Sequence, residues 1–256
     1  MRKNVCLITG GAGFLGRKYC EFFLSKNYAV LCVDNNKKNL QSIKHINSKK
    51  NFFVYECDIT NEKKVKNLFK KINKSFSVNV LINNAAIDAI PFKKENDNQK
   101  FPTDKNWDIE MNVSLKGSFL MIKYFGEEMI KRNVGSIINI GSDLSVIAPN
   151  QKIYKSSYKN YIKPVTYSVI KHAMVGLTKY FASLYARNNV RVNMISPGPI
   201  KKNQSKRFLN ELKNVIPMER LADANEILGL LFFLASSESS YITGQNILID
   251  GGRTII

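Results

Sequence analysis

Short apolar runs alternate with longer stretches in which apolar residues recur at helical spacing. Apolar runs of four to eight residues that end at glycine, asparagine or aspartate are typical of strands buried on both faces. The predicted strands are Asn4–Thr9, Ala29–Asp34, Phe52–Cys57, Val78–Asn83, Ser136–Gly141, Val190–Ile195 and Asn246–Asp250. The predicted helices are Phe14–Lys26, Lys37–Lys49, Glu62–Lys74, Trp107–Arg132, Thr166–Arg187, Asn203–Asn214 and Asp223–Ala235.

This alternation predicts an α/β fold with a single Rossmann-type, doubly wound parallel sheet of about seven strands and helices on both faces. Two connections are longer than the rest: Ala89–Lys105 is predicted as a loop, and Ala148–Pro164 as a polar and aromatic connection. No linker rich in Pro, Gly or Ser divides the chain, and it has no internal repeat. Residues 1–256 are therefore expected to form one domain that includes the active site.

Composition narrows the class of protein. Apolar residues make up 44% of the chain, but no apolar run reaches the roughly 18–20 residues of a membrane span. The N-terminus lacks a signal-peptide cleavage region, so a cytoplasmic protein without a membrane partner is expected. The cysteines have no metal-site spacing, so buried free thiols, no disulfide and no bound metal are expected. They are Cys6, Cys20, Cys32 and Cys57.

The formal net charge is +19. The lysines are scattered, and no helix carries a basic stripe with interleaved aromatic residues, so a nucleic-acid partner is not expected. Two explanations stay open: a solvated basic surface, or attraction of an anionic small-molecule substrate.

A glycine-rich turn, TGGAGFLG, separates the first predicted strand from the first helix. Glycines at Gly10, Gly13 and Gly16 allow a tight turn, close approach of a pyrophosphate, and close packing of helix on strand. The helix N-terminus, with Phe14 and Leu15, would then face the phosphates of a dinucleotide.

The acid that ends the second strand favours one dinucleotide. The carboxylate of Asp34, followed by Asn35, can accept both ribose hydroxyls and would repel a 2′-phosphate, so NAD is expected rather than NADP. Asp34 can also be a turn or cap residue. Arg17 and Lys37 lie close enough in sequence to keep NADP open.

Tyr167 and Lys171 are spaced i, i+4, which puts them on one face of the predicted helix. A free phenol has a pKa near ~10, and a neighbouring ammonium favours the phenolate. Tyr167 could then exchange a proton with an alcohol or a carbonyl. Ser142 follows the fifth strand at its carboxyl end, where open α/β sheets bind ligands, although a serine there can simply cap a turn.

Together these motifs resemble the short-chain dehydrogenase/reductase superfamily, in its compact single-domain branch. The resemblance implies an oxidoreductase that uses NAD(P), with Tyr167 as acid/base, Lys171 lowering its pKa and holding the nicotinamide ribose, and Ser142 orienting the substrate oxygen. It also implies that Asn112 supports a proton-relaying water. Further residues matched to the cofactor-contacting motifs are Asp58, Ile59, Asn84, Ala85, Ala86, Pro197, Gly198 and Ile200.

Two departures and one insertion set this chain apart. Phe14 stands where compact members have a glycine, and the threonine expected shortly after Pro197–Gly198 is missing. The stretch 148–166 is longer than usual and rich in lysine and tyrosine: it carries Tyr154, Tyr158, Tyr161, Lys152, Lys155 and Lys159. It either shapes access for an anionic substrate or is an ordinary surface excursion.

The insertion is similar to that of dehydrogenases in flagellin modification and surface-sugar biosynthesis, which implies a sugar or sugar-nucleotide derivative as substrate. A 3-oxoacyl-thioester or other ketone reductase, and a non-catalytic cofactor-sensing protein, are the alternatives. The family resemblance also implies a homotetramer or homodimer formed through the helices Trp107–Arg132 and Thr166–Arg187.

Overall fold

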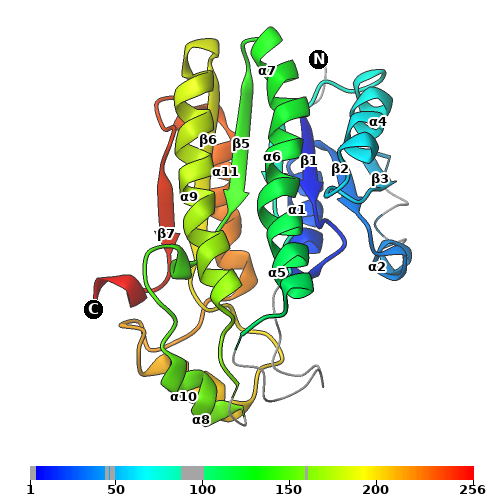
Figure 1. The fold of residues 1–256 in the computed structure, drawn as a ribbon. Helices are drawn as coiled ribbons and strands as arrows, with labels where there is room; N and C mark the ends of the chain where they lie inside the picture. Colours follow the sequence, from blue (N-terminus) through cyan, green and yellow to red (C-terminus); the bar gives the residue numbers. More distant parts are fainter. Residues whose placement is uncertain (1–3, 44–45, 47–49, 88–100, 159–160) are drawn as a thin grey trace.

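The computed structural model describes residues 4–43, 46, 50–87, 101–158 and 161–256, which contain a seven-stranded sheet (Figure 1). Every strand pair is parallel, and the order is β3-β2-β1-β4-β5-β6-β7. The order reverses between β1 and β4, which opens a crevice at the carboxyl ends of these strands. The strands are β1 (Val5–Thr9), β2 (Ala29–Asp34), β3 (Phe52–Glu56), β4 (Val80–Asn83), β5 (Gly135–Ile140), β6 (Val190–Pro197) and β7 (Asn246–Ile249).

Helices cover both faces of the sheet, with α5, α6, α7 and α9 in front of it and α1 and α11 behind it in Figure 1. The predicted doubly wound α/β class is therefore confirmed. The helices are α1 (Phe14–Ser25), α2 (Lys37–Ser42), α4 (Glu62–Asn73), α5 (Asp104–Met111), α6 (Gly117–Met121), α7 (Glu127–Lys131), α8 (Gln151–Ser157), α9 (Val165–Tyr185), α10 (Lys206–Lys213) and α11 (Leu228–Ala235).

Alternating side chains of the central strands divide the apolar core into two layers. Leu7 of β1 packs in the layer that contains Leu120 and Phe181 of α6 and α9. Ile8, its neighbour in the chain, packs in the layer that contains Phe23 of α1. Because both faces of a parallel sheet are covered, its strands are continuously apolar, as the sequence pattern predicted. All four cysteines are buried and free, as expected.

Two predicted helices differ clearly from the structure. The helix predicted at Trp107–Arg132 begins at Asp104, capped by the Thr103 hydroxyl, and contains π-helical turns at Asn112–Lys116 and Ile122–Gly126. The predicted helix at 37–49 ends at Ser42, and residues 44–45 and 47–49 lie outside the described residues. Most of the predicted loop at 89–105 also lies outside them.

The connection predicted at Ala148–Pro164 contains a helix, α8, which was not among the predicted helices. Ile153 and Tyr154 of α8 are buried against Phe208 and Leu212 of α10, and this tertiary packing makes the helix stable. Both helices lie beyond the carboxyl ends of the strands, at the bottom of Figure 1. Among the described residues, no helix is both long and apolar enough to cross a bilayer.

Candidate active site

A pocket of about 740 Å³ lies along the carboxyl ends of the strands and extends toward α8 and α10. The candidate residues for cofactor binding and for catalysis meet there, although they come from most of the chain. Those that line the pocket are Gly10, Gly13, Phe14, Leu15, Asp34, Asn35, Asp58, Ile59, Asn84, Ala85, Ala86, Ser142, Tyr167, Lys171, Pro197, Gly198 and Ile200. Gly16 and Asn112 do not line it.

The glycine turn requires glycine at its two ends. Gly10 has φ +61°, and a Cβ there would lie 2.8 Å from the Ala85 Cα. A Cβ on Gly16 would lie 2.1 Å from the Gly10 carbonyl oxygen, so Gly16 acts from behind the pocket by allowing α1 to pack on the turn. Phe14 begins α1 with its side chain 40% exposed, which explains why a ring is tolerated where compact relatives have glycine.

Thr9 and Asn84 join the glycine turn to the end of β4. The Thr9 hydroxyl accepts hydrogen bonds from the backbone N–H groups of Asn84 and Ala85, both at 3.1 Å. The Asn84 side-chain amide donates to the carbonyls of Thr9 and Gly10, at 3.0 and 3.1 Å. These bonds hold the turn in one conformation from a second strand, so its backbone is preorganised.

The N-terminus of α1 fits a pyrophosphate. Its N-cap, Gly13, makes no side-chain cap bond, and the first turn carries no acidic residue. By contrast, side chains of Asn36, Asn61 and Thr103 cap α2, α4 and α5. An uncapped helix start that faces a pocket leaves backbone N–H groups for an anion.

Asp34 lines this pocket together with the glycine turn. Its Oδ2 accepts from the backbone N–H of Ala12 at 3.1 Å, and its Oδ1 accepts from that of Asn36 at 2.9 Å. Asp34 is thus a turn residue as well as a pocket-lining acid. Arg17 donates to the carbonyl of Ala12 at 2.8 Å and to the Ser42 hydroxyl, and it does not line the pocket.

Tyr167 and Lys171 project from the first two turns of α9 into the other end of the pocket. The Lys171 Nζ is buried, donates to the carbonyl of Ile140 at 3.0 Å, and lies 5.6 Å from the centroid of the Tyr167 ring. Thr166, beside the tyrosine, donates its hydroxyl to the Glu110 carboxylate of α5. The start of α9 is therefore anchored to β5 and to α5.

Buried polar side chains also hold the middle of α9 on the sheet. The amide of Asn83 donates to Asn139 at 2.9 Å across the β4–β5 register pair. The amide of Asn139 donates to the Thr178 hydroxyl of α9, also at 2.9 Å. This chain of hydrogen bonds fixes the height of α9 relative to the strands.

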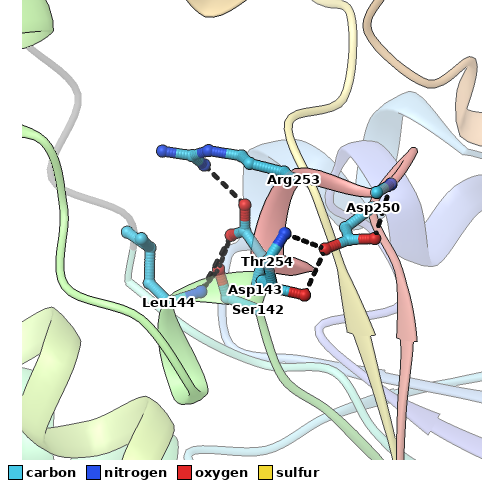
Figure 2. Close-up of polar contacts among 7 residues, drawn as sticks. Ser142, Asp143, Leu144, Asp250, Arg253 and Thr254 are labelled. Atoms are coloured by element: carbon cyan, nitrogen blue, oxygen red, sulfur yellow. Dashed lines mark hydrogen bonds and ion pairs between the residues drawn. The ribbon is translucent and has the colours of Figure 1, made fainter. Parts of the chain in front are cut away.

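Ser142 is held by a buried ion pair (Figure 2). Its hydroxyl donates to Oδ1 of Asp143 at 2.9 Å, and Oδ2 of Asp143 accepts from Arg253 at 2.5 Å. Ser142 also caps the following turn, since its Oγ accepts from the Leu144 N–H at 3.2 Å. Cap and candidate catalytic group are therefore the same residue.

The turn that carries Arg253 is itself tied together at Asp250 (Figure 2). Burial alone would raise the pKa of Asp250. Hydrogen bonds from the Thr254 hydroxyl and from the N–H groups of Gly252 and Thr254 outweigh burial and hold that pKa below its ordinary value. The ionised carboxylate thus stabilises the turn from which Arg253 reaches Asp143.

Comparisons with known proteins identify the family of this chain. Residues 12–254 match the family model described as Enoyl-(Acyl carrier protein) reductase. A short-chain dehydrogenase from Leptospira borgpetersenii, solved with bound NAD+, is 33% identical, with a TM-score of 0.84 over 99% of this chain and 94% of that one. The chain belongs to the short-chain dehydrogenase/reductase superfamily.

Curated relatives span almost the whole chain. The 3-oxoacyl-[acyl-carrier-protein] reductase of Thermotoga maritima is 31% identical over 98% of this chain and 98% of its own. The NAD-dependent glycerol dehydrogenase of Listeria innocua is 32% identical over 98% of this chain and 94% of its own. This short-chain dehydrogenase/reductase is therefore an oxidoreductase of a family whose members act with NAD or NADP.

Asn112 occupies a different place from the other candidates. It begins the first π-helical turn and lines a groove between α5–α6 and α9 that includes Phe119 and Tyr180. Val113, the next residue, lines the main pocket. π-helical turns are frequent at functional sites, because they displace a backbone carbonyl from the regular ladder.

Sequence reasoning missed several residues at the substrate end of the pocket. Lys152 and Lys155 of α8 are exposed and do not line it, and Lys159 lies outside the described residues. Lys163 is buried and does line it, as do aromatic side chains of the 148–166 segment. Tyr154 and Tyr158 of the predicted insertion line the pocket, and the missed lining residues are Asp143, Lys163, Lys202, Gln204, Phe208 and Arg253.

The i, i+4 spacing of Tyr154 and Tyr158, which places both on one helical face, was the available signal for the helix α8. Gln204 holds the loop that follows Pro197–Gly198. The Gln204 amide donates to the carbonyl of Ile200 at 2.8 Å, and its Oε1 accepts from the N–H of Lys202 at 2.6 Å. This side chain closes the loop beside the pocket.

Proposed function

We propose that this short-chain dehydrogenase/reductase transfers a hydride between NAD and a secondary alcohol or ketone of a sugar derivative. The observation that carries the proposal is the convergence of Tyr167, Lys171 and Ser142 on the substrate end of one pocket, with Asp34 at its other end. A protein that only bound the cofactor and catalysed no reaction would not need these three side chains in one place.

Tyr167 acts as the base in the direction of alcohol oxidation. Its phenolate accepts the hydroxyl proton of the substrate while the C–H bond of the same carbon gives up its electron pair as hydride. The ammonium of Lys171 stabilises that phenolate. Ser142 hydrogen-bonds the substrate oxygen as its charge changes.

One part of the chemistry comes from the nicotinamide cofactor when it is bound: it accepts the hydride, or returns it in the reverse direction. Gly10, Gly13 and the start of α1 would hold its pyrophosphate. In this proposal Asn112 supports a water that relays protons, as the family resemblance implies.

NAD is the proposed cofactor because the carboxylate of Asp34 would repel a 2′-phosphate. The cations that could reverse this preference are engaged elsewhere. Arg17 is bound to Ala12 and Ser42, and Lys37 lies 3.6 Å from the Glu56 carboxylate.

The segment 148–166 supports a sugar derivative, as in surface-glycan or flagellin modification. Tyr154 and Tyr158 line the pocket, and aromatic rings that carry hydroxyls suit a polyhydroxylated ring or chain. The name of the Listeria glycerol dehydrogenase likewise indicates NAD and a polyhydroxylated alcohol for that relative.

A 3-oxoacyl-thioester reductase is the second candidate. The Thermotoga relative carries that name, and Phe208 and Leu212 of α10 add apolar surface that an acyl chain could contact. The two candidates separate on cofactor and substrate, since strong NADPH preference with acyl-thioester turnover would overturn the first.

A homotetramer or homodimer is proposed through α5–α7 and α9. Their outer faces expose Phe119, Tyr180 and Leu184, at 40%, 65% and 54% of full exposure. Light scattering is expected to give a tetramer or a dimer, and a monomer at micromolar concentration would refute this arrangement. The cytoplasmic location and the absence of a nucleic-acid partner stay predictions.

Tyr167→Phe tests the proposed mechanism. The variant keeps the ring and loses the proton-transferring oxygen, so NAD-linked turnover of a screened alcohol panel is expected to fall at least about 100-fold. NADH binding, followed by fluorescence, is expected to change little. Undiminished turnover by Tyr167→Phe would show that another group moves the proton.

A further inference from the structure

The hydroxyl of Ser142 is held from two sides by its own turn. It donates to Oδ1 of Asp143 at 2.9 Å and accepts from the backbone N–H of Leu144 at 3.2 Å. A serine otherwise has three staggered χ1 positions and a hydroxyl hydrogen that rotates freely. Because two partners act on the same oxygen, they select one χ1 position. The place of Oγ at the pocket wall is therefore set by the turn itself.

Asp143 keeps partners whether or not Ser142 donates to it. Its Oδ1 also accepts from the Leu144 N–H at 2.8 Å, and its Oδ2 accepts from Arg253 at 2.5 Å. The residue is 3% exposed, and burying a carboxylate without partners is costly. Since each oxygen keeps one donor, the Ser142 hydrogen can turn away from Asp143 without leaving a buried charge unpaired.

Arg253 reaches this site from the turn after β7. It is 6% exposed and lines the same pocket as Ser142 and Asp143. The carboxylate of Asp250 holds the turn that carries it (Figure 2). A charge-assisted hydrogen bond from this fixed guanidinium holds Asp143, and Asp143 in turn holds Ser142.

We propose that Asp143 and Arg253 are positioning residues for the reaction at Ser142. The proposal rests on the proposed function, because it takes Ser142 as the group that hydrogen-bonds the substrate oxygen. In the free enzyme the Ser142 hydrogen points to Asp143. As negative charge gathers on the substrate oxygen, this hydrogen turns to that oxygen while the Leu144 N–H keeps Oγ in place. Asp143 and Arg253 act through Ser142, without a contact of their own to the substrate.

Two double variants separate the hydrogen-bond acceptor from the ion pair. Arg253→Met with Asp143→Asn removes both charges and keeps a side-chain oxygen for Ser142. Arg253→Met with Asp143→Leu removes both charges and that oxygen, and leucine has the branched shape of asparagine. Both are made with Ser142 and with Ser142→Ala. For each, kcat and KM with the most active alcohol of the panel, and Kd for NADH, are measured well below its Tm.

The asparagine variant is expected to have a kcat about 10- to 100-fold above that of the leucine variant, because a displaced Oγ loses its bond to the reacting oxygen. KM and the Kd for NADH are expected to agree within about threefold. In the Ser142→Ala background the two are expected to have equal kcat, because Asp143 then has no hydroxyl to hold. A merely structural defect lowers kcat in both backgrounds.

Crystal structures of the two double variants show the position of Ser142 directly, and they decide the positioning step wherever turnover is too slow. Ser142 is expected in one χ1 rotamer beside asparagine and in more than one beside leucine. Arg253→Met with Asp143→Ala, which also lacks the acceptor, takes the place of the leucine variant if that one does not fold.

Three results would overturn the proposal. The first is an equal kcat of the asparagine and leucine variants when Ser142 is present. The second is a single, unchanged Ser142 rotamer beside leucine. The third is a kcat difference that persists in Ser142→Ala, which would show that Asp143 acts on another group. Undiminished turnover by Tyr167→Phe would overturn the proposed function and leave these comparisons unaffected, so the two failures are distinguishable.

Discussion

Removing Arg253 is expected to destabilise the fold and to disturb Ser142 at the same time. The Asp143–Arg253 pair is 2.5 Å long, and the two side chains are only 4% and 5% exposed. Arg253→Met keeps much of the aliphatic length and deletes the charge. It leaves a buried carboxylate without its partner, which costs far more than the loss of a surface pair.

The size of the effect follows from this burial. Breaking a buried pair by removing one partner costs about 3–5 kcal/mol, and in a domain of this size 1 kcal/mol shifts Tm by roughly 2–4 °C. Arg253→Met is therefore expected to lower Tm by about 6–20 °C. Asp143→Asn in the same chain removes the stranded charge and keeps an Oδ1 acceptor for Ser142 and Leu144, so the double variant should regain part of the loss.

Thermal unfolding followed by circular dichroism gives the Tm of Arg253→Met, of Asp143→Asn and of the double variant. Arg220→Met is the surface control, since the Arg220–Glu226 pair is 2.7 Å long with side chains 49% and 41% exposed; its Tm should move much less. Two results would refute the reasoning: an Arg253→Met variant as stable as wild type, or a double variant whose loss is the sum of the single losses.

Three further predictions concern the cofactor pocket and the surface. Asp34→Ser should raise kcat/KM with NADPH relative to NADH by at least about tenfold, because it removes a charge facing the 2′-position; an unchanged cofactor ratio in steady-state assays would contradict this role. Gly16→Ala places a Cβ 2.1 Å from the Gly10 carbonyl oxygen and should weaken NADH binding by about 10- to 100-fold in a fluorescence titration, whereas Gly229→Ala, whose Cβ meets no atom within 4 Å, should bind NADH normally. Hydrogen bonds from the Arg220 side chain and then from the Asp223 N–H lower the pKa of Glu226 to about 2. The ionised form therefore adds stability above the ordinary carboxyl range that is lost as pH falls toward 2, and Glu226→Gln should show a flatter Tm profile below pH ~5; equal profiles would show that this pair is irrelevant to acid unfolding.

The sheet, and the position of the glycine turn and Asp34 at the strand ends, were predictable because their signals are local. Each strand is a continuous apolar run, and the glycine turn and Asp34 follow their strands directly. Tyr167 and Lys171 lie one turn apart on one helix. In each case, residues close in sequence carry the geometry.

The rest depended on contacts between distant segments. Asp143 and Arg253 are 110 positions apart, and nothing near either residue in sequence indicates its partner. The helix α8 is stable because it packs on α10, so its own polar sequence resembled a connection. Lys163 was hidden for the same reason: among many lysines, only the packing of α8 distinguishes it from the exposed Lys152 and Lys155.

The packing of α8 on α10 also has a dynamic consequence. Their apolar cluster, built around Tyr154 and Phe208, is separate from the two clusters that cover the sheet. A unit with its own small core can open at a fraction of the free energy of global unfolding. Amide hydrogens of α8 and α10 should therefore exchange with solvent well before those of β5. The pair α8–α10 can then unfold locally while the sheet stays folded.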